Sequence, residues 1–358
     1  MSVCGPILLS AQSEVPPRIE KFINELEVQK NELQGGAIAI LHKGRVIYKS
    51  TFGKQNGNSG QITPTTLFPL ASVSKVVSAT AIALMVDKGL LSFHEKFKLP
   101  CLKNPVSLSN ILSHTTGYQF SGNAEIEQGM SRAKLLNIIQ RQQPKGNPGQ
   151  SYRYSNTMFS LVEEALNTKN LNLGIAIERL GADLNTQGLQ VLPIQTNVEV
   201  AYPHSKTAVD GVDTITPLPF PPYYPKTVPA SAGVFASLDG MIELFKLCFG
   251  YRPDLISQKT LDVMFTPVKS NDDCFKWNLG KPVDKKNIES LYALGWRILR
   301  AKKHPEEKLI FHSGYINGIG SFIGFIPSEE IGIIFLSNQR TPIPVKMGIK
   351  LWGELLKS

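Results

Sequence analysis

With 358 residues, of which 42% are hydrophobic and 19% charged, the chain has the composition of an ordinary globular protein with a large core. No apolar run reaches the ~18 residues of a membrane-spanning helix, which argues against an integral membrane span. The net charge of +9 favours contact with acidic surfaces. However, the basic residues are scattered and no lysine- and arginine-rich block carries interleaved aromatics, so we expect no nucleic-acid partner.

The four cysteines form no C-x-x-C pair, and the six histidines show no metal-ligand spacing, so we expect buried thiols, no metal and no cofactor. Residues 1–13 contain a short apolar run before small residues, typical of the end of a signal peptide, but without the usual basic segment. We interpret them as a signal remnant or a disordered tail. On this basis we favour a periplasmic or secreted location over a cytoplasmic one.

The hydrophobic pattern predicts strands near both ends of the chain and helices between them. A helix over 14–33 precedes strands over 35–41 and 46–52. Further helices are predicted over 72–88, 106–114, 131–141, 155–166, 171–180, 237–249 and 258–265, and residues 207–229 read as a proline-rich, ordered wrap. The C-terminal part predicts strands over 293–300, 308–312, 320–325 and 331–337, then a helix ending at Leu356.

This order of elements predicts an α+β fold, an α/β sandwich. Its antiparallel sheet is assembled from N- and C-terminal segments and flanked by helices, with an inserted, mainly helical subdomain. We expect a single domain over 14–358, with the sheet part in 14–65 and 225–358 and the helical part in 66–224. The active site is expected at the junction of the two parts.

A candidate nucleophile lies at the predicted start of the 72–88 helix. Ser72 and Lys75 are three residues apart, so the hydroxyl and the ammonium share one helix face. The N–H groups of a first helical turn can also donate to an anion that forms there. A serine that only caps the helix, followed by a solvent-exposed lysine, would produce the same S-x-x-K pattern. The pattern also recurs at Ser131 and Lys134. The pair becomes informative only with ordered partners elsewhere.

Two further short patterns follow in order. Tyr154-Ser155-Asn156 precedes an apolar helix, and His312-Ser313-Gly314 ends a predicted strand. With them, the chain resembles the serine β-lactamase and penicillin-binding protein clan over roughly residues 20–357. The resemblance is to its class C–like branch of β-lactamases, D-alanyl peptidases and esterases. The segments 112–117, 148–156, 229–239, 294–296 and 333–338 are similar to other stretches of that branch.

The resemblance implies a serine hydrolase that forms an acyl-enzyme on Ser72. Lys75 and Tyr154 would act together as the general base, with Tyr154 slightly favoured, because both ordinarily hold their protons up to about pH 10 and each is helped by nearby charge. Asn156 would hold Lys75 and orient a substrate amide, and could also cap the following helix. The backbone N–H groups of Ser72 and Tyr315 would form the oxyanion hole.

The strand motif is where the chain departs from the β-lactamases of the clan. Ser313 and Gly314 would line the substrate, with glycine leaving room at the strand edge. His312 stands where those enzymes carry a lysine, and an imidazole with an ordinary pKa of about 6.5 can be neutral. It is therefore open whether His312 is protonated and, as a cation, stabilises an anionic Tyr154.

The leading functional hypothesis is a class C–like β-lactamase that hydrolyses the β-lactam amide. A carboxylesterase or a D-alanyl or D-amino peptidase on the same site is the nearest alternative. An alternative of another class is a non-hydrolytic module that binds or senses peptidoglycan fragments. The expected partners are small-molecule β-lactam, ester or D-amino peptide substrates.

Overall fold

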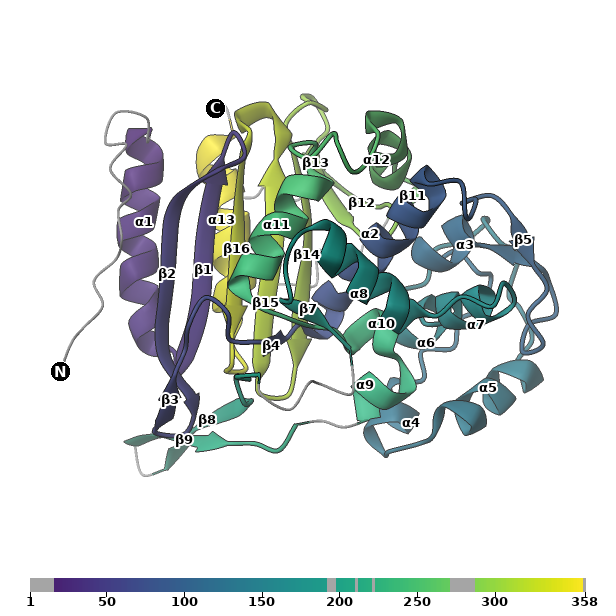
Figure 1. The fold of residues 1–358 in the computed structure, drawn as a ribbon, viewed down its shortest axis with the longest axis horizontal. Helices are drawn as coiled ribbons and strands as arrows, with labels where there is room; N and C mark the ends of the chain where they lie inside the picture. Colours follow the sequence, from purple (N-terminus) through teal and green to yellow (C-terminus); the bar gives the residue numbers. More distant parts are fainter. Residues whose placement is uncertain (1–15, 192–197, 210–211, 221–222, 271–286, 357–358) are drawn as a thin grey trace.

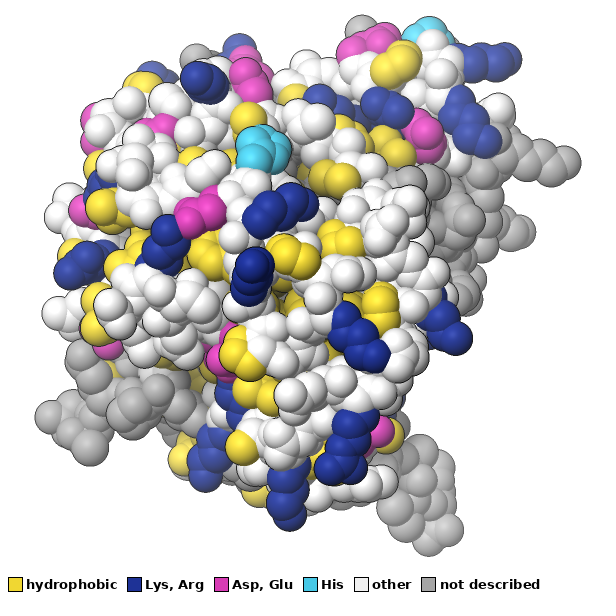
Figure 2. Space-filling view, turned by 90° about the vertical axis from the view of Figure 1, so that its right-hand side faces the viewer, with side chains coloured by type: hydrophobic (Ala, Val, Ile, Leu, Met, Phe, Trp, Pro, Cys, Tyr) yellow, Lys and Arg dark blue, Asp and Glu magenta, His cyan; other side chains and the backbone are white. Residues whose placement is uncertain are grey.

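A computed structural model describes residues 16–191, 198–209, 212–220, 223–270 and 287–356 of the chain. The tail predicted over 1–13 lies outside the described residues. None of the described helices is both long and apolar enough to cross a membrane. Lysine and arginine side chains are spread over the face shown in Figure 2 and are not gathered in one block.

One large antiparallel sheet joins the two ends of the chain (Figure 1). Strand β1 pairs along its length with β16, and Ile38 lies opposite Phe335. Both strands are nearly continuous apolar runs, as expected for strands covered on two faces. Among the described residues the sheet order is β11 (Lys269–Ser270), β12 (Ile288–Tyr292), β13 (Arg297–Ala301), β14 (Lys308–Ile316), β15 (Ile319–Ile326), β16 (Ile331–Ser337), β1 (Gly35–His42), β2 (Arg45–Asn56) and β3 (Ser59–Gln61).

Helices cover both faces of this sheet (Figure 1). On one face, α1 (Pro17–Gln29) and α13 (Ile343–Leu355) bury Phe22 and Trp352 against the strands. On the other face, α2 (Ser74–Asp87) and α11 (Leu238–Cys248) lie in the larger core. Helix α2 is buried on all sides from Ser74 to Leu84. Because it is packed on every side, α2 is a rigid support for any side chain that it carries into the site.

The remaining elements lie mostly beside the sheet, on the right of Figure 1. The helices are α3 (Leu108–Leu112), α4 (Asn123–Glu127), α5 (Arg132–Arg141), α6 (Asn156–Phe159), α7 (Leu161–Asn167), α8 (Leu173–Asp183), α9 (Tyr223–Thr227), α10 (Pro229–Ala232) and α12 (Gln258–Phe265). The short strands are β4 (Phe68–Pro69), β5 (Lys96–Phe97), β6 (Val106–Ser107), β7 (Leu189–Gln190), β8 (His204–Val209), β9 (Val212–Pro217) and β10 (Phe235–Ala236). The predicted fold class is confirmed, whereas the division into 14–65 with 225–358 and 66–224 stays a prediction.

Several predicted elements were wrong in detail. The stretch over 207–229, predicted as an ordered, proline-rich wrap without strands, contains most of the β8–β9 hairpin, whose β-branched residues outweigh the nearby prolines. The helix predicted over 106–114 begins only at Leu108, because Ser107 forms a capping box with Asn110. The helix predicted over 155–166 is divided into α6 and α7, and the strand predicted over 293–300 begins only at Arg297.

Candidate active site

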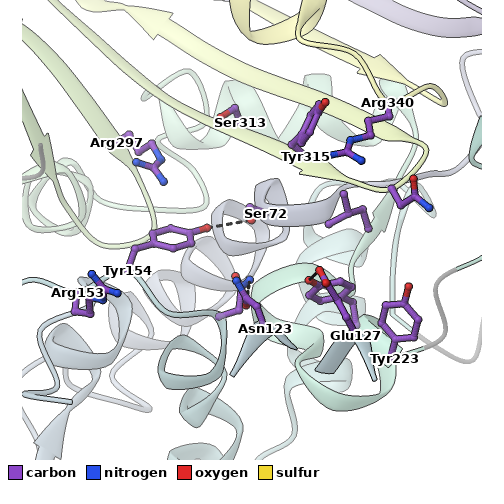
Figure 3. A pocket seen from close by; sticks show the side chains of 14 residues that line it. Ser72, Asn123, Glu127, Arg153, Tyr154, Tyr223, Arg297, Ser313, Tyr315 and Arg340 are labelled. Atoms are coloured by element: carbon purple, nitrogen blue, oxygen red, sulfur yellow. Dashed lines mark hydrogen bonds between the residues drawn. The ribbon is translucent and has the colours of Figure 1, made fainter. Parts of the chain in front are cut away.

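A cavity of about 760 Å³ between the sheet and the helical part is lined by five of the predicted site residues, Ser72, Tyr154, Asn156, Ser313 and Tyr315 (Figure 3). Its walls come from the turn before α2, from α4, α6 and α9, and from β13 and β14. The lining residues are Ser72, Asn123, Glu127, Arg153, Tyr154, Asn156, Tyr223, Tyr224, Arg297, Ser313, Tyr315, Ile316, Asn317 and Arg340. Ser131, by contrast, precedes α5 and is not part of the lining.

Ser72 lies in a 3₁₀ turn, η2 (Ala71–Val73), directly before α2. The α-helix predicted to begin at Ser72 therefore begins two residues later, at Ser74. Ala71 has a φ of 47°, in the left-handed region that a residue with a side chain adopts only under strain. The turn is held in place by Ser321, whose Oγ donates a hydrogen bond to the carbonyl oxygen of Leu70 at 2.7 Å.

Gly314 keeps β14 close to this turn. A Cβ at Gly314 would lie 2.2 Å from the carbonyl oxygen of Leu70 and 2.2 Å from Ser321 Oγ. Gly314 itself does not line the cavity. The missing side chain is therefore explained by packing of the strand on the nucleophile turn, and not, as predicted, by space for substrate.

Lys75 is fully buried on α2. Its Nζ lies 2.6 Å from Asn156 Oδ1, 2.9 Å from the carbonyl oxygen of Ser231 and 3.5 Å from Ser72 Oγ. Burial, together with the positive charge of Arg297, holds the pKa of Lys75 well below its usual value and favours the neutral amine. If the two N–H groups of that amine donate to Asn156 and Ser231, the lone pair faces the Ser72 hydroxyl.

Tyr154 is the second group of the general-base pair in contact with Ser72. Its hydroxyl donates a hydrogen bond to Ser72 Oγ at 3.0 Å (Figure 3). The Lys75 Nζ lies 4.8 Å from the centre of the Tyr154 ring. Asn156 follows in α6, where Ser155 is the N-cap, so the alternative role of Asn156 as the cap was wrong. The structure thus brings Ser72, Lys75, Tyr154 and Asn156 together, as the resemblance implied.

Arg297 is a site residue that the sequence analysis missed. Its guanidinium carbon lies 4.9 Å from the centre of the Tyr154 ring and 5.7 Å from that of Tyr292. The side chain is buried, with 5% of its surface exposed. The sequence signal was an arginine directly after Trp296, inside a predicted strand where a charge is unexpected. A guanidinium is always protonated, so Arg297 places a permanent positive charge beside Tyr154.

Three buried side chains, those of His114, Tyr292 and His312, form a directed set of hydrogen bonds behind the site. The Ser155 N–H donates to His114 Nδ1 at 3.2 Å, which leaves the His114 proton on Nε2, 3.2 Å from the Tyr292 hydroxyl. That hydroxyl then donates to His312 Nε2 at 3.1 Å, and His312 Nδ1 donates to the Ser313 carbonyl at 2.9 Å. Each ring nitrogen has a partner when both imidazoles are neutral.

His312 therefore differs from a lysine in its charge. Burial, then the positive charge of Arg297, hold the pKa of His312 well below its usual value. The imidazole is fully buried and does not line the cavity. The structure accordingly gives the role of permanent cation beside Tyr154 to Arg297 and leaves His312 as a neutral group that positions Ser313.

The edge of β14 that faces the cavity carries Tyr315. β14 and β15 are joined by a two-residue turn, Asn317-Gly318. In such a hairpin the backbone groups point alternately toward and away from the partner strand, so those of Ser313 and Tyr315 point away from β15. β13 pairs with β14 only as far as Phe311. The Tyr315 N–H is therefore on an open strand edge, as an oxyanion-hole donor requires.

Comparisons with known proteins agree with this fold. The model of the Beta-lactamase family matches residues 23–350. Protein flp of Staphylococcus aureus (strain N315) is 23% identical over 352 residues, which cover 92% of this chain and 64% of that protein. The chain thus spans less than two thirds of that relative.

A second curated relative is similar over nearly its whole length. The Beta-lactamase of Escherichia coli (strain K12) is 23% identical over 367 residues, with 94% of this chain and 92% of that protein covered. A solved structure, the octameric penicillin-binding protein homologue from Pyrococcus abyssi, has a TM-score of 0.73 at 20% identity. That match covers 93% of this chain and 76% of the other and shows a common fold.

Proposed function

This chain belongs to the Beta-lactamase family, whose members are generally serine hydrolases, and we propose that it hydrolyses a β-lactam amide through an acyl-enzyme on Ser72. One observation carries the proposal. The Ser72 hydroxyl lies 3.0 Å from the Tyr154 hydroxyl and 3.5 Å from a buried lysine amine, at the wall of a cavity that can hold a small substrate. A serine attacks well only when a neighbouring base takes its proton.

In the acylation step, Ser72 Oγ forms a bond to the substrate carbonyl carbon and its proton passes to the Lys75–Tyr154 pair. The carbonyl oxygen becomes an anion that accepts hydrogen bonds from the backbone N–H groups of Ser72 and Tyr315. When the carbon–nitrogen bond breaks, the proton returns from the pair to the leaving nitrogen through Tyr154. Arg297 stabilises the negative charge that Tyr154 carries whenever it lacks its proton.

In the deacylation step, water attacks the ester carbonyl of the acyl-enzyme. Its proton passes to the same pair, the carbon–oxygen bond to Ser72 breaks, and Ser72 recovers a proton. A neutral Lys75 suits both steps, because an amine held by Asn156 and Ser231 can accept a proton without moving.

A second candidate function is hydrolysis of esters or D-amino peptides at the same site. The observation that favours it is the buried, neutral His312, because the strand then presents no lysine-like charge for the carboxylate of a β-lactam. The two candidates have the same nucleophile and the same acyl-enzyme, and differ in what the cavity accepts.

Intact-protein mass spectrometry separates these functions, with a penicillin and a fluorophosphonate as the two reagents and Ser72→Ala as the matched control. A penicilloyl adduct that turns over supports the β-lactamase, and a stable adduct supports a penicillin-binding protein. Phosphonylation without reaction toward penicillin supports the esterase or peptidase. If neither reagent modifies Ser72, the catalytic proposal is wrong and a binding or sensing module remains.

A further inference from the structure

We propose that the part of the cavity that holds the acyl group binds a primary ammonium at Glu127, so that the preferred acyl donors carry an amine several bonds from the scissile carbonyl. The inference rests on the proposed acyl-enzyme chemistry and specifies its substrate class. Its basis is the distribution of charge within the cavity.

The position of Tyr154 separates the two halves of the cavity. Because Tyr154 returns the proton to the leaving group, that group lies on the side of Tyr154 and Arg297. The acyl group must then extend from Ser72 in the other direction. Figure 3 shows Glu127 and Tyr223 on that opposite side of Ser72.

The acyl half contains a carboxylate within an otherwise basic cavity. Three of the lining residues are arginines, Arg153, Arg297 and Arg340, and within the described part of the chain Glu127 is the only acid among the lining residues. Glu127 Oε1 accepts a hydrogen bond from the Tyr224 hydroxyl at 2.8 Å. No cation of the described residues forms an ion pair with Glu127.

The surroundings of this carboxylate suit an ammonium better than a neutral donor. The rings of Tyr223 and Tyr224 lie beside it in the lining, with centroids 5.5 Å apart and planes inclined by 54°. An ammonium is attracted both to a carboxylate and to the face of an aromatic ring. Arg340 is already stacked on Tyr315, with its guanidinium carbon 5.0 Å from that ring centre, on the upper side of the cavity in Figure 3.

The fold also indicates which part of the substrate would carry the ammonium. Asn156 Nδ2 donates to Asn123 Oδ1 at 3.0 Å, which anchors the start of α4 beside the catalytic residues. Glu127 is four residues further along α4, about 6 Å in helical rise. The amine that it binds is therefore remote from the scissile carbonyl and is not its α-amino group.

The test uses pairs of boronic acids that differ only at the far end of the acyl chain. One member of each pair is an ω-aminoacyl-D-boroalanine, and the other is its N-acetyl derivative, with spacers of increasing length. Ser72 Oγ donates an electron pair to boron and its proton passes to the Lys75–Tyr154 pair, so that no group leaves. Inhibition constants are measured by competition with fluorophosphonate labelling, and affinities are measured directly by calorimetry.

Because Glu127 is exposed to solvent, we expect the wild-type protein to bind the amine about 3- to 30-fold more tightly than the acetylated compound at the best spacer length. Glu127→Gln keeps an acceptor for Tyr224 and removes the charge. The ratio of the two affinities should therefore fall close to one, while the acetylated compound binds as before. Tyr224→Phe keeps the carboxylate and should retain the preference. Thermal unfolding of each variant checks that the fold is intact.

Equal affinities for the two members of each pair in the wild type would overturn the inference. It would also be overturned if Glu127→Gln weakened both compounds alike, because Glu127 would then only anchor α9. Loss of the preference in Tyr224→Phe would overturn it as well, because the Tyr224 hydroxyl and not the carboxylate would then carry the preference. These outcomes leave labelling of Ser72 unchanged. Failure of the proposed function would instead appear as absent labelling, and calorimetry would still decide the amine preference.

Discussion

Replacing Arg297 by glutamine tests whether this side chain supplies the charge that activates Tyr154. The guanidinium carbon lies 4.9 Å from the centre of the Tyr154 ring. At an effective dielectric constant of about 20, one unit charge at this distance stabilises an opposite charge by ~3 kcal/mol. If that stabilisation applies in the acylation transition state, Arg297→Gln should lower the acylation rate by about 100-fold.

The pH profile provides a second readout of the same substitution. The positive charge of Arg297 is the second cause, after burial, of the lowered pKa of Lys75. A base whose pKa is lowered becomes available above that pKa, so acylation should rise with pH as Lys75 loses its proton. Without Arg297 the pKa of Lys75 rises, and this limb of the profile should move to higher pH.

The assay is the second-order rate of fluorophosphonate labelling of Ser72 across pH, with thermal unfolding as a check on folding. Arg297→Lys is the matched control, because it keeps the charge and loses the planar group, and it should recover part of the rate. An Arg297→Gln protein that labels within threefold of the wild type, with an unmoved profile, would refute the reasoning.

Three other substitutions test the positioning of the site. Asn156→Asp puts a carboxylate where an oxygen now lies 2.6 Å from Lys75 Nζ, which favours the ammonium, so labelling at neutral pH should slow by about tenfold or more. Gly314→Ala brings a Cβ within 2.2 Å of the Leu70 carbonyl oxygen, so we expect a loss of ~1–3 kcal/mol in the free energy of unfolding and slower labelling. Burial raises the pKa of Glu163 from 4.5 to about 7, so the folded state holds this proton more tightly than the unfolded chain. Stability should therefore fall as pH rises between these values, and Glu163→Gln should remove that slope.

Matched variants make these outcomes decisive. Gly89→Ala replaces a glycine whose φ is +73°, unlike that of Gly314, and a Cβ there meets nothing within 4 Å, so labelling should be unchanged. Glu164→Gln alters the neighbouring acid that pairs with the same arginine, Arg132, and should keep the pH slope of stability. The packing argument for Gly314 fails if its alanine variant matches Gly89→Ala. The argument for Asn156 fails if Asn156→Asp labels at the wild-type rate.

Local spacing made Ser72 and Lys75 candidates in the sequence, but only the ordered partners of the family motifs separated them from the copy at Ser131 and Lys134. Ser72 and Lys75 are three residues apart, and any helical turn brings side chains at that spacing onto one face. The apolar runs of β1 and β16 likewise predicted buried strands, because burial on both faces demands such a composition. The order of the motifs then linked Tyr154 and Asn156 to the same site.

Contacts between residues far apart in the chain could not be predicted from local spacing. The carbonyl oxygen that accepts from Lys75 belongs to Ser231, 156 residues away in the chain. Glu127 and Tyr224 are joined across 97 residues, and neither lies in a motif. Such pairs depend on how helices and strands pack, which the spacing of residues within one element does not specify.

The charge beside Tyr154 shows this division most clearly. The sequence identified His312 in the strand motif but left its charge open, because an exposed imidazole has a pKa near 6.5 and can take either form. Tertiary structure buries that imidazole completely and brings Arg297, from the adjacent strand β13, over the Tyr154 ring. An imidazole without access to water favours the neutral form, whereas a guanidinium keeps its charge when buried. The fold therefore places the permanent cation on β13 and not at the motif histidine.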